Sequence, residues 1–213
     1  MTTIYIHKGE YGHGEACHAL IRACAEDFCA ENGIARTSFE IVTAENGKPF
    51  FADGPGDGHV DFSVSNSGDY WVCAVSTEPC GVDVQVEEDR DTDAIARRMF
   101  KPGELEYIRK EGPKGFYKLW TRREAYGKLT GKGFFGPIPD LVNKNGQLLN
   151  EVPVPAVLSG SATDPTVALS DIEVGDPFEN VHCSLCSFGD GYCLRSAFCC
   201  RTEAWGVISP LRA

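Results

Sequence analysis

The sequence predicts an α+β protein made of two similar α/β lobes packed into one compact unit. Two observations predict this fold class. Each half of the chain combines helix-spaced apolar residues with several short segments typical of strands, and the composition changes after Val86, where the polar run EEDRDTD begins. We therefore expect one lobe over residues 1–88 and a second over residues 89–213. A chain of 213 residues, 42% of them hydrophobic, is long enough to bury a sizeable core.

The first half is expected to contain one helix and several strands. Apolar residues recur every four positions between Glu15 and Glu31, which predicts a helix that ends at Asn32-Gly33. That helix should bury one stripe, made of Ala16, Leu20, Cys24 and Phe28, with Ala23 beside it. Strands are expected at residues 3–7, 37–43, 60–65, 70–76 and 81–86.

The second half is expected to contain three helices before its strands. Thr92 is a candidate N-cap for a helix that reaches Phe100, and Pro102 suits the first turn of the next, which reaches about Lys110. A third helix should run from about Phe116 to Leu129, closed by Gly131. The chain then predicts a hairpin over 139–149 with Asn145-Gly146 at its tip, a strand at 166–172 and two strands around Gly189-Asp190-Gly191.

Charge and hydropathy exclude several function classes. A net charge of −11 argues against binding the phosphate backbone of nucleic acids. No run of about 18 apolar residues predicts a membrane span, and the first residues, MTTIYIHKGEYGHGE, lack the layout of a signal peptide. We expect a cytoplasmic protein, with a monomer sufficient for function because both lobes lie in one chain.

Ten cysteines are many for this length. Without an export signal, reduced thiols are favoured over disulfides. Five of the cysteines cluster late, in HCSLCSF and YCLRSAFCC, where they are interpreted as small buried strand residues. The alternative is a zinc site that begins with Cys183 and Cys186.

Two acidic positions are candidates for chemistry. In GVDVQ, alternation places Asp83 and Gln85 on one face of a strand and the flanking valines on the other, which makes Asp83 either a metal ligand or a solvated edge residue. In WTRREAYGKLTGKGF, Trp120, Glu124 and Lys128 share one helix face. The Glu124–Lys128 spacing alone suits an ordinary surface pair, with Trp120 as a core anchor.

Two further segments carry polar groups that suit a phosphate. FSVSNSG presents Ser65 and Asn66 near the end of a strand, and ENGKPFF presents Lys48 after a tight turn. Turn chemistry and a solvated lysine explain these two segments equally well when each is taken alone.

The order of these segments, GKP, FSVSNSG, GVD and WxxxEAYxKxxGKG, resembles the motif series of the 4′-phosphopantetheinyl transferases, specifically the larger, surfactin-synthetase-activating type. The resemblance covers about residues 40–135. It implies an intramolecular pseudodimer with the active site at the interface of the two lobes. It also implies transfer of the 4′-phosphopantetheine arm of coenzyme A to a serine hydroxyl of an acyl or peptidyl carrier protein, with release of adenosine 3′,5′-bisphosphate.

The resemblance assigns roles to individual residues. It implies that Asp83 and Glu124 hold magnesium, with manganese as an alternative, and that Glu124 is also the proposed base. Lys128 would face the pyrophosphate, Lys48 would contact a coenzyme A phosphate, and Ser65 matches the serine before the family's usual histidine.

Four departures from the family pattern qualify these roles. Asn66 stands where the family commonly has histidine, Gln85 where many larger members have a second acid, and Arg123 where the helix usually has lysine. Basic residues are also few before Lys48, so we expect Arg22 to help hold the nucleotide. The rival interpretations are a weakened relative that binds coenzyme A or a carrier protein without efficient transfer, and a zinc-dependent interaction module.

Overall fold

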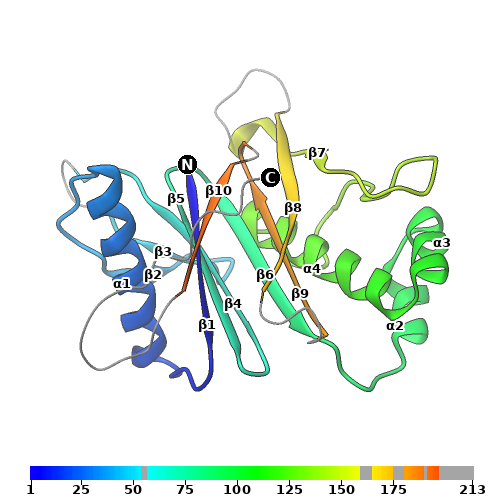
Figure 1. Ribbon diagram of the computed structural model, residues 1–213. Coiled ribbons are helices and arrows are strands. Elements are labelled where there is room, and N and C mark those ends of the chain that lie inside the picture. Colours follow the sequence, from blue (N-terminus) through cyan, green and yellow to red (C-terminus); the bar gives the residue numbers. More distant parts are fainter. Residues whose placement is uncertain (54–56, 159–164, 175–179, 190, 197–213) are drawn as a thin grey trace.

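The computed structural model describes residues 1–53, 57–158, 165–174, 180–189 and 191–196, and it confirms the predicted α+β class (Figure 1). The first half of the described chain contains β1 (Thr2–Lys8), α1 (Glu15–Asn32), β2 (Ile41–Thr43), β3 (Pro49–Phe51), β4 (Asp61–Ser67), β5 (Tyr70–Ser76) and β6 (Cys80–Val86). The second half contains α2 (Thr92–Met99), α3 (Pro102–Glu111), α4 (Pro113–Thr130), β7 (Glu151–Pro153), a 3₁₀ turn (Ala156–Leu158), β8 (Thr166–Ile172), β9 (Val181–Ser187) and β10 (Tyr192–Ser196).

Two four-stranded sheets form the centre of the molecule. The first sheet has the strand order β10-β1-β5-β4 and the second the order β6-β9-β8-β7, while β2 and β3 form a separate hairpin. Most pairs are antiparallel, and the parallel exception is β1 with β10. Strand β4 therefore lies at an edge of the first sheet and β6 at an edge of the second.

The layers follow the order α1, first sheet, second sheet, α4, with α2 and α3 beside α4 (Figure 1). Alternation along each strand sends side chains to opposite faces, so each sheet contributes to two cores. On β5, Trp71 and Cys73 pack toward α1, whereas Val72 and Ala74 pack between the sheets. Burying both faces explains why β5, with the sequence YWVCAVS, is almost continuously apolar.

The third predicted helix is longer than its apolar pattern suggested. Helix α4 begins at Pro113, whose missing N–H is harmless in a first turn, and it ends at Gly131 in the left-handed conformation with φ 67°. Gly115, just before the predicted start, lies inside the helix, where a Cβ would meet Glu111, Ile108 and Tyr107 of α3.

Three other local expectations need correction. Only residues 41–43 of the expected strand 37–43 form a strand, and they pair with β3, a strand that the sequence did not predict. The N-cap of α2 is Asp91, whose carboxylate accepts the Ala94 N–H at 2.9 Å, and not Thr92. The buried stripe of α1 contains Ile21, Ala25 and Cys29 with Cys24 and Phe28, and Ala16 is exposed.

The division at residues 88 and 89, and the similarity of the two lobes, stay predictions. The sheets themselves exchange strands across that division. Strand β6, from the first half of the chain, pairs with β9 in the second sheet, and β10 returns to pair with β1 in the first. In the described part of the chain, no helix combines the length and apolarity that crossing a bilayer requires.

Candidate active site

The candidate site lies where β4, β6 and α4 meet, at the seam between the two sheets. Helix α4 approaches β6 closely because Gly81 has no side chain. A Cβ there would lie 2.0 Å from the Ala125 carbonyl oxygen and 2.6 Å from the Leu129 nitrogen. The alternation predicted for β6 is confirmed, because Val82 and Val84 are buried between the sheets while Asp83 faces α4 and contacts Lys128.

Asp83 is the centre of a buried polar cluster. Its Oδ1 accepts a hydrogen bond from the Ser65 hydroxyl at 2.7 Å and lies 2.8 Å from Lys128 Nζ. The Lys128 ammonium also donates to the carbonyl oxygens of Val82 at 3.0 Å and Val64 at 3.3 Å. The aspartate side chain is 8% exposed and the lysine side chain 29%, so their attraction is only partly screened by solvent.

This geometry excludes the ordinary surface pair for Glu124 and Lys128. Within the described residues, no ion pair joins the two, and the ammonium contacts Asp83 instead. Glu124 is half-buried beside this cluster. Asp83 lies on β6 and Glu124 on the adjacent helix α4, and the negative charge of Asp83 contributes to raising the pKa of Glu124.

Burial raises the pKa of both carboxyl groups. Desolvation raises the pKa of Asp83 above its ordinary value of 3.8, against the opposing effects of Lys128 and Ser65. Burial is also the main reason that the pKa of Glu124 rises above 4.5, and the negative charge of Asp83 adds to it. A half-buried carboxyl with a raised pKa has the electrostatics of a proton acceptor near neutral pH.

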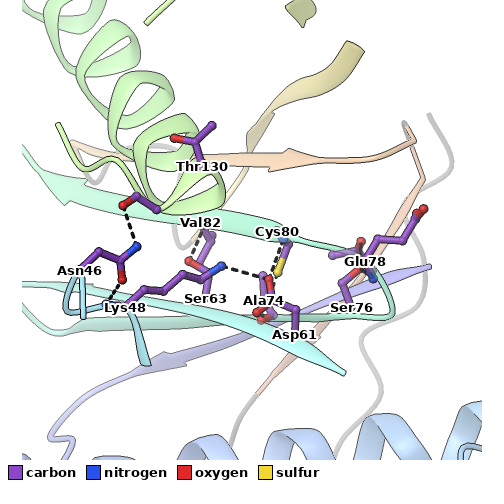
Figure 2. Close-up of polar contacts among 12 residues, drawn as sticks. Asn46, Lys48, Asp61, Ser63, Ala74, Ser76, Glu78, Cys80, Val82 and Thr130 are labelled. Atoms are coloured by element: carbon purple, nitrogen blue, oxygen red, sulfur yellow. Dashed lines mark hydrogen bonds and ion pairs between the residues drawn. The ribbon is translucent and has the colours of Figure 1, made fainter. Parts of the chain in front are cut away.

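Side chains of β4, and not paired backbones, join the two sheets at this seam. Ser63 Oγ accepts the Val82 N–H and Ser67 Oγ accepts the Val86 N–H, each at 3.0 Å, while Asp61 Oδ2 accepts the Cys80 N–H at the same distance. Figure 2 shows the Asp61 and Ser63 contacts. The period-2 spacing in FSVSNS could have indicated this row, because residues 61, 63, 65 and 67 share one face of a strand.

Lys48 lies at one end of the seam. Its ammonium contacts Asp61 Oδ2 at 3.1 Å (Figure 2). The loop that carries it is tied to the end of α4, because the Asn46 side chain donates to the Gly131 carbonyl at 2.9 Å. Lys48 and Lys128 both line a cavity of about 240 Å³, whose other walls are residues 46, 47, 49 and 62–64 and the glycines at 127, 131 and 133.

The remaining predicted positions lie farther along the seam or away from it. The Asn66 amide donates to the Tyr11 hydroxyl at 3.0 Å, a contact that no sequence signal indicated. Gln85 follows Asp83 on β6, and its amide nitrogen donates to Ser67 Oγ at 3.1 Å and to Glu88 Oε1 at 3.2 Å. Arg22 lies on α1, on the outer face of the first sheet, and pairs with Glu15, so the structure does not bring it to the others.

Arg123, next to Glu124, faces a different environment. Its guanidinium lies over the rings of Phe134, at 5.1 Å, and Phe100, at 5.8 Å. Trp120 packs on Phe116 and Phe134 and anchors this side of α4, as the sequence predicted. Arg123 therefore supports the packing of the helix and does not line the cavity beside Lys128.

The donor set fits a hard divalent cation. It consists of oxygen donors, the carboxylates of Asp83 and Glu124, with the Gln85 amide farther along the same strand. Among the described residues, no group of three or more His, Cys, Asp and Glu side chains is placed to hold a metal. Magnesium often binds through one or two carboxylates and completes its shell with substrate phosphates and water, so two acids beside a lysine-lined cavity suit it.

The late cysteines described by the structure do not form such a group either. Cys183 and Cys186 are buried on β9, and burial raises the pKa of both thiols well above the ordinary value, which favours the uncharged form. Cys193, expected to be buried, is instead exposed on β10. Cys199 and Cys200 lie outside the described residues.

Comparison with known proteins agrees with the motif order. The sequence model described as the 4′-phosphopantetheinyl transferase superfamily matches residues 79–150, which include β6 and α4. A 4′-phosphopantetheinyl transferase of Bacillus subtilis is 34% identical over 138 residues, covering 63% of this chain and 58% of the relative.

Two further relatives carry the same description. The 4′-phosphopantetheinyl transferase Sfp of Bacillus subtilis strain 168 is 30% identical over 55% of this chain and 54% of its own length. The 4′-phosphopantetheinyl transferase gsp of Aneurinibacillus migulanus is 29% identical over 67% of this chain and 56% of its own length. The chain thus spans a little over half of the length of the relatives that it matches.

Proposed function

Because the chain belongs to the 4′-phosphopantetheinyl transferase superfamily, and within it to the larger type of which Sfp is a member, we propose that it transfers the 4′-phosphopantetheine arm of coenzyme A to a carrier protein. The acceptor is a serine hydroxyl of an acyl or peptidyl carrier protein, and the second product is adenosine 3′,5′-bisphosphate. The observation that carries the proposal is the contact of Lys128, one helical turn after Glu124 on α4, with Asp83 on β6, at a cavity that Lys48 also lines.

The roles of the lysines follow from charge. Lys48 and Lys128 line a cavity of about 240 Å³, and each is paired with an aspartate, Asp61 and Asp83, in a protein of net charge −11. Lys48 and Lys128 would bind phosphate oxygens of coenzyme A and so hold the pyrophosphate in the orientation that transfer requires. Positioning and charge neutralisation are the main contributions that proteins make to phosphoryl-type transfer.

Glu124 is the proposed proton acceptor. The serine oxygen forms a bond to the phosphorus that carries pantetheine, and the bond from that phosphorus to the bridging oxygen breaks. The serine proton passes to the Glu124 carboxylate, directly or through one water, and the leaving phosphate keeps the electron pair of the broken bond. Burial of Glu124 supports this role, because the raised pKa strengthens the carboxylate as a base.

Asp83 and Glu124 would hold the divalent cation, with Gln85 as an additional ligand through its amide oxygen or a bound water. When bound, magnesium supplies positive charge to the pyrophosphate oxygens. We also propose that the protein acts in the cytoplasm as a monomer. Ser65 would orient Asp83 through the 2.7 Å hydrogen bond, and Asn66, in contact with Tyr11, would offer an uncharged amide to the nucleotide.

The test is mass spectrometry of a panel of apo carrier proteins, from fatty-acid, polyketide and peptide synthesis, after incubation with the protein, coenzyme A and magnesium. We expect at least one to gain the mass of phosphopantetheine, and we expect Asp83→Asn and Glu124→Gln to lose most of that activity. Glu106→Gln is the matched control, because Glu106 is an exposed carboxylate on α3 that pairs with Arg109. Coenzyme A binding without any modified carrier would instead establish the weakened relative.

A further inference from the structure

The Lys128 ammonium is surrounded by three oxygen acceptors that come from both sheets. Its three acceptors are Val64 O at 3.3 Å on β4, Val82 O at 3.0 Å on β6 and Asp83 Oδ1 at 2.8 Å on β6. An ammonium has three N–H donors and no acceptor. All three donors therefore have a partner, and the lysine links the edge of the first sheet to the edge of the second.

The position of the ammonium overlaps the position that a divalent cation would take when it binds Asp83. A magnesium ligand lies about 2.1 Å from the ion. The ammonium, 2.8 Å from Asp83 Oδ1, already neutralises the carboxylate that the ion needs. Because the Asp83 side chain is 8% exposed, repulsion between the ammonium and a dication at the same oxygen would be weakly screened.

We infer that the Lys128 ammonium competes with the divalent metal for Asp83 until a phosphate draws the ammonium away. The inference rests on the proposed function and adds an order to it. The metal alone binds weakly, and a phosphate that accepts hydrogen bonds from Lys128 makes Asp83 available to the metal. Binding of the metal and of the phosphate is then mutually reinforcing, since linkage between two ligands is reciprocal.

Manganese binding without coenzyme A or carrier protein tests the competition directly. Electron paramagnetic resonance measures free Mn²⁺ in a titration of wild-type protein, Lys128→Gln and Lys128→Met. Glutamine removes the charge and keeps a donor for the carbonyl groups, and methionine removes both. We expect both variants to bind Mn²⁺ roughly tenfold more tightly than wild type, because an uncompensated carboxylate attracts the dication.

Lys118→Gln is the matched control. Lys118 lies on the same helix and its ammonium also approaches an aspartate, Asp171, at 3.5 Å, so this variant carries the same change in net charge. Its Mn²⁺ affinity should equal that of wild type. Unchanged or weaker binding in both Lys128 variants, or an equal gain in Lys118→Gln, would overturn the inference.

A fourth variant, Asp83→Asn, separates this inference from the proposed function. In wild-type protein, Asp83→Asn should weaken Mn²⁺ binding. If it does not, the metal site of the proposed function is wrong and the inference is overturned with it. If Asp83→Asn weakens binding but neither Lys128 variant strengthens it, only the competition is wrong.

Discussion

At the scale of single residues, the seam holds lysine and aspartate side chains in compensating pairs. Lys48 contacts Asp61 and Lys128 contacts Asp83, at 3.1 and 2.8 Å. Within the described residues, Glu124 makes no ion pair, although it is half-buried near Asp83. A carboxyl in that position is poorly solvated and repelled by its neighbour, which is a cost to the fold that a bound cation would relieve.

Glu124→Gln should therefore stabilise the metal-free protein at neutral pH while it removes transfer. Because the pKa of Glu124 is raised on folding, the folded state binds more protons than the unfolded state, and stability falls as pH increases from about the ordinary value of 4.5 to the raised value. The substitution removes this decline. After allowance for solvent screening, we expect the free energy of unfolding to increase by roughly 0.5 kcal/mol at pH 7.

Urea unfolding in the presence of a chelator, at several pH values, measures this gain. The difference between variant and wild type should be small near pH 4 and should grow toward neutral pH. A variant that is less stable than wild type at pH 7 would show that Glu124 makes a favourable contact in the metal-free state.

Asp61→Asn should strengthen the binding of adenosine 3′,5′-bisphosphate, if that product occupies the cavity as proposed. Asp61 Oδ2 both neutralises Lys48 and accepts the Cys80 N–H. Asparagine keeps an oxygen acceptor for the N–H and leaves the Lys48 charge uncompensated. We expect affinity to rise by roughly twofold to fivefold, as for loss of an ion pair worth up to about 1 kcal/mol.

Isothermal titration calorimetry measures this affinity, with Asp140→Asn as the control. Asp140 also pairs with a lysine, Lys101, at 2.7 Å, but this pair lies outside the cavity. An unchanged or lower affinity in Asp61→Asn alone would show that Lys48 does not contact the nucleotide.

At the scale of elements, the close approach of α4 to β6 places the site. Helix α4 carries Glu124 and Lys128, and β6 carries Asp83. Only glycine at position 81 allows the two backbones to lie as close as they do, since a Cβ would meet the Ala125 oxygen at 2.0 Å. The contact therefore fixes the distance between helix and strand, and with it the distance between the charged groups.

Gly81→Ala should destabilise the protein and reduce transfer together. Both atoms that a Cβ would meet, Ala125 O and Leu129 N, belong to backbone and cannot rotate away. We expect a loss of about 2–4 kcal/mol in the free energy of unfolding, at the upper end for an overpacked core. Gly103→Ala is the control, because nothing lies within 4 Å of a Cβ at that position in α3.

The measurement is chemical denaturation of both variants, followed by the transfer assay at a temperature where each is folded. Gly103→Ala should stay within about 1 kcal/mol of wild type. If Gly81→Ala kept wild-type stability and activity, the separation of α4 and β6 would not control the site.

At the scale of the whole molecule, net charge and exposed apolar surface determine how a carrier protein can approach. The protein carries −11, and carriers of this class are expected to be acidic, so long-range attraction does not favour encounter. Among the large apolar residues that flank the motif helices, Phe100 and Phe134 are buried and Met99 is partly buried. Phe135 is 86% exposed, just beyond the glycine turn that follows α4.

Phe135→Ser should therefore raise the KM for an acidic carrier protein by roughly tenfold and leave kcat nearly unchanged, as expected for loss of one buried aromatic contact. Phe135→Leu, which keeps an apolar side chain, should retain most of the affinity.

The rate of transfer by the wild type should stay constant or rise from low to moderate salt, at constant magnesium activity, because salt screens the repulsion between the two acidic proteins. A steep fall with salt would indicate recruitment by a basic surface.

The sequence by itself determined the local elements of this protein, because the period of its apolar residues distinguishes helix from strand. Alternation in GVDVQ was enough to place Asp83 on the strand face opposite its valine neighbours. The glycines that follow the apolar helical patterns predicted the ends of α1 and α4, at Gly33 and Gly131. Only the tertiary structure decided that Lys128 contacts Asp83 and not Glu124, and that β4 joins β6 through serine side chains. These contacts join residues 19 to 45 positions apart across a sheet edge, and they depend on how the two sheets pack, which no local period encodes.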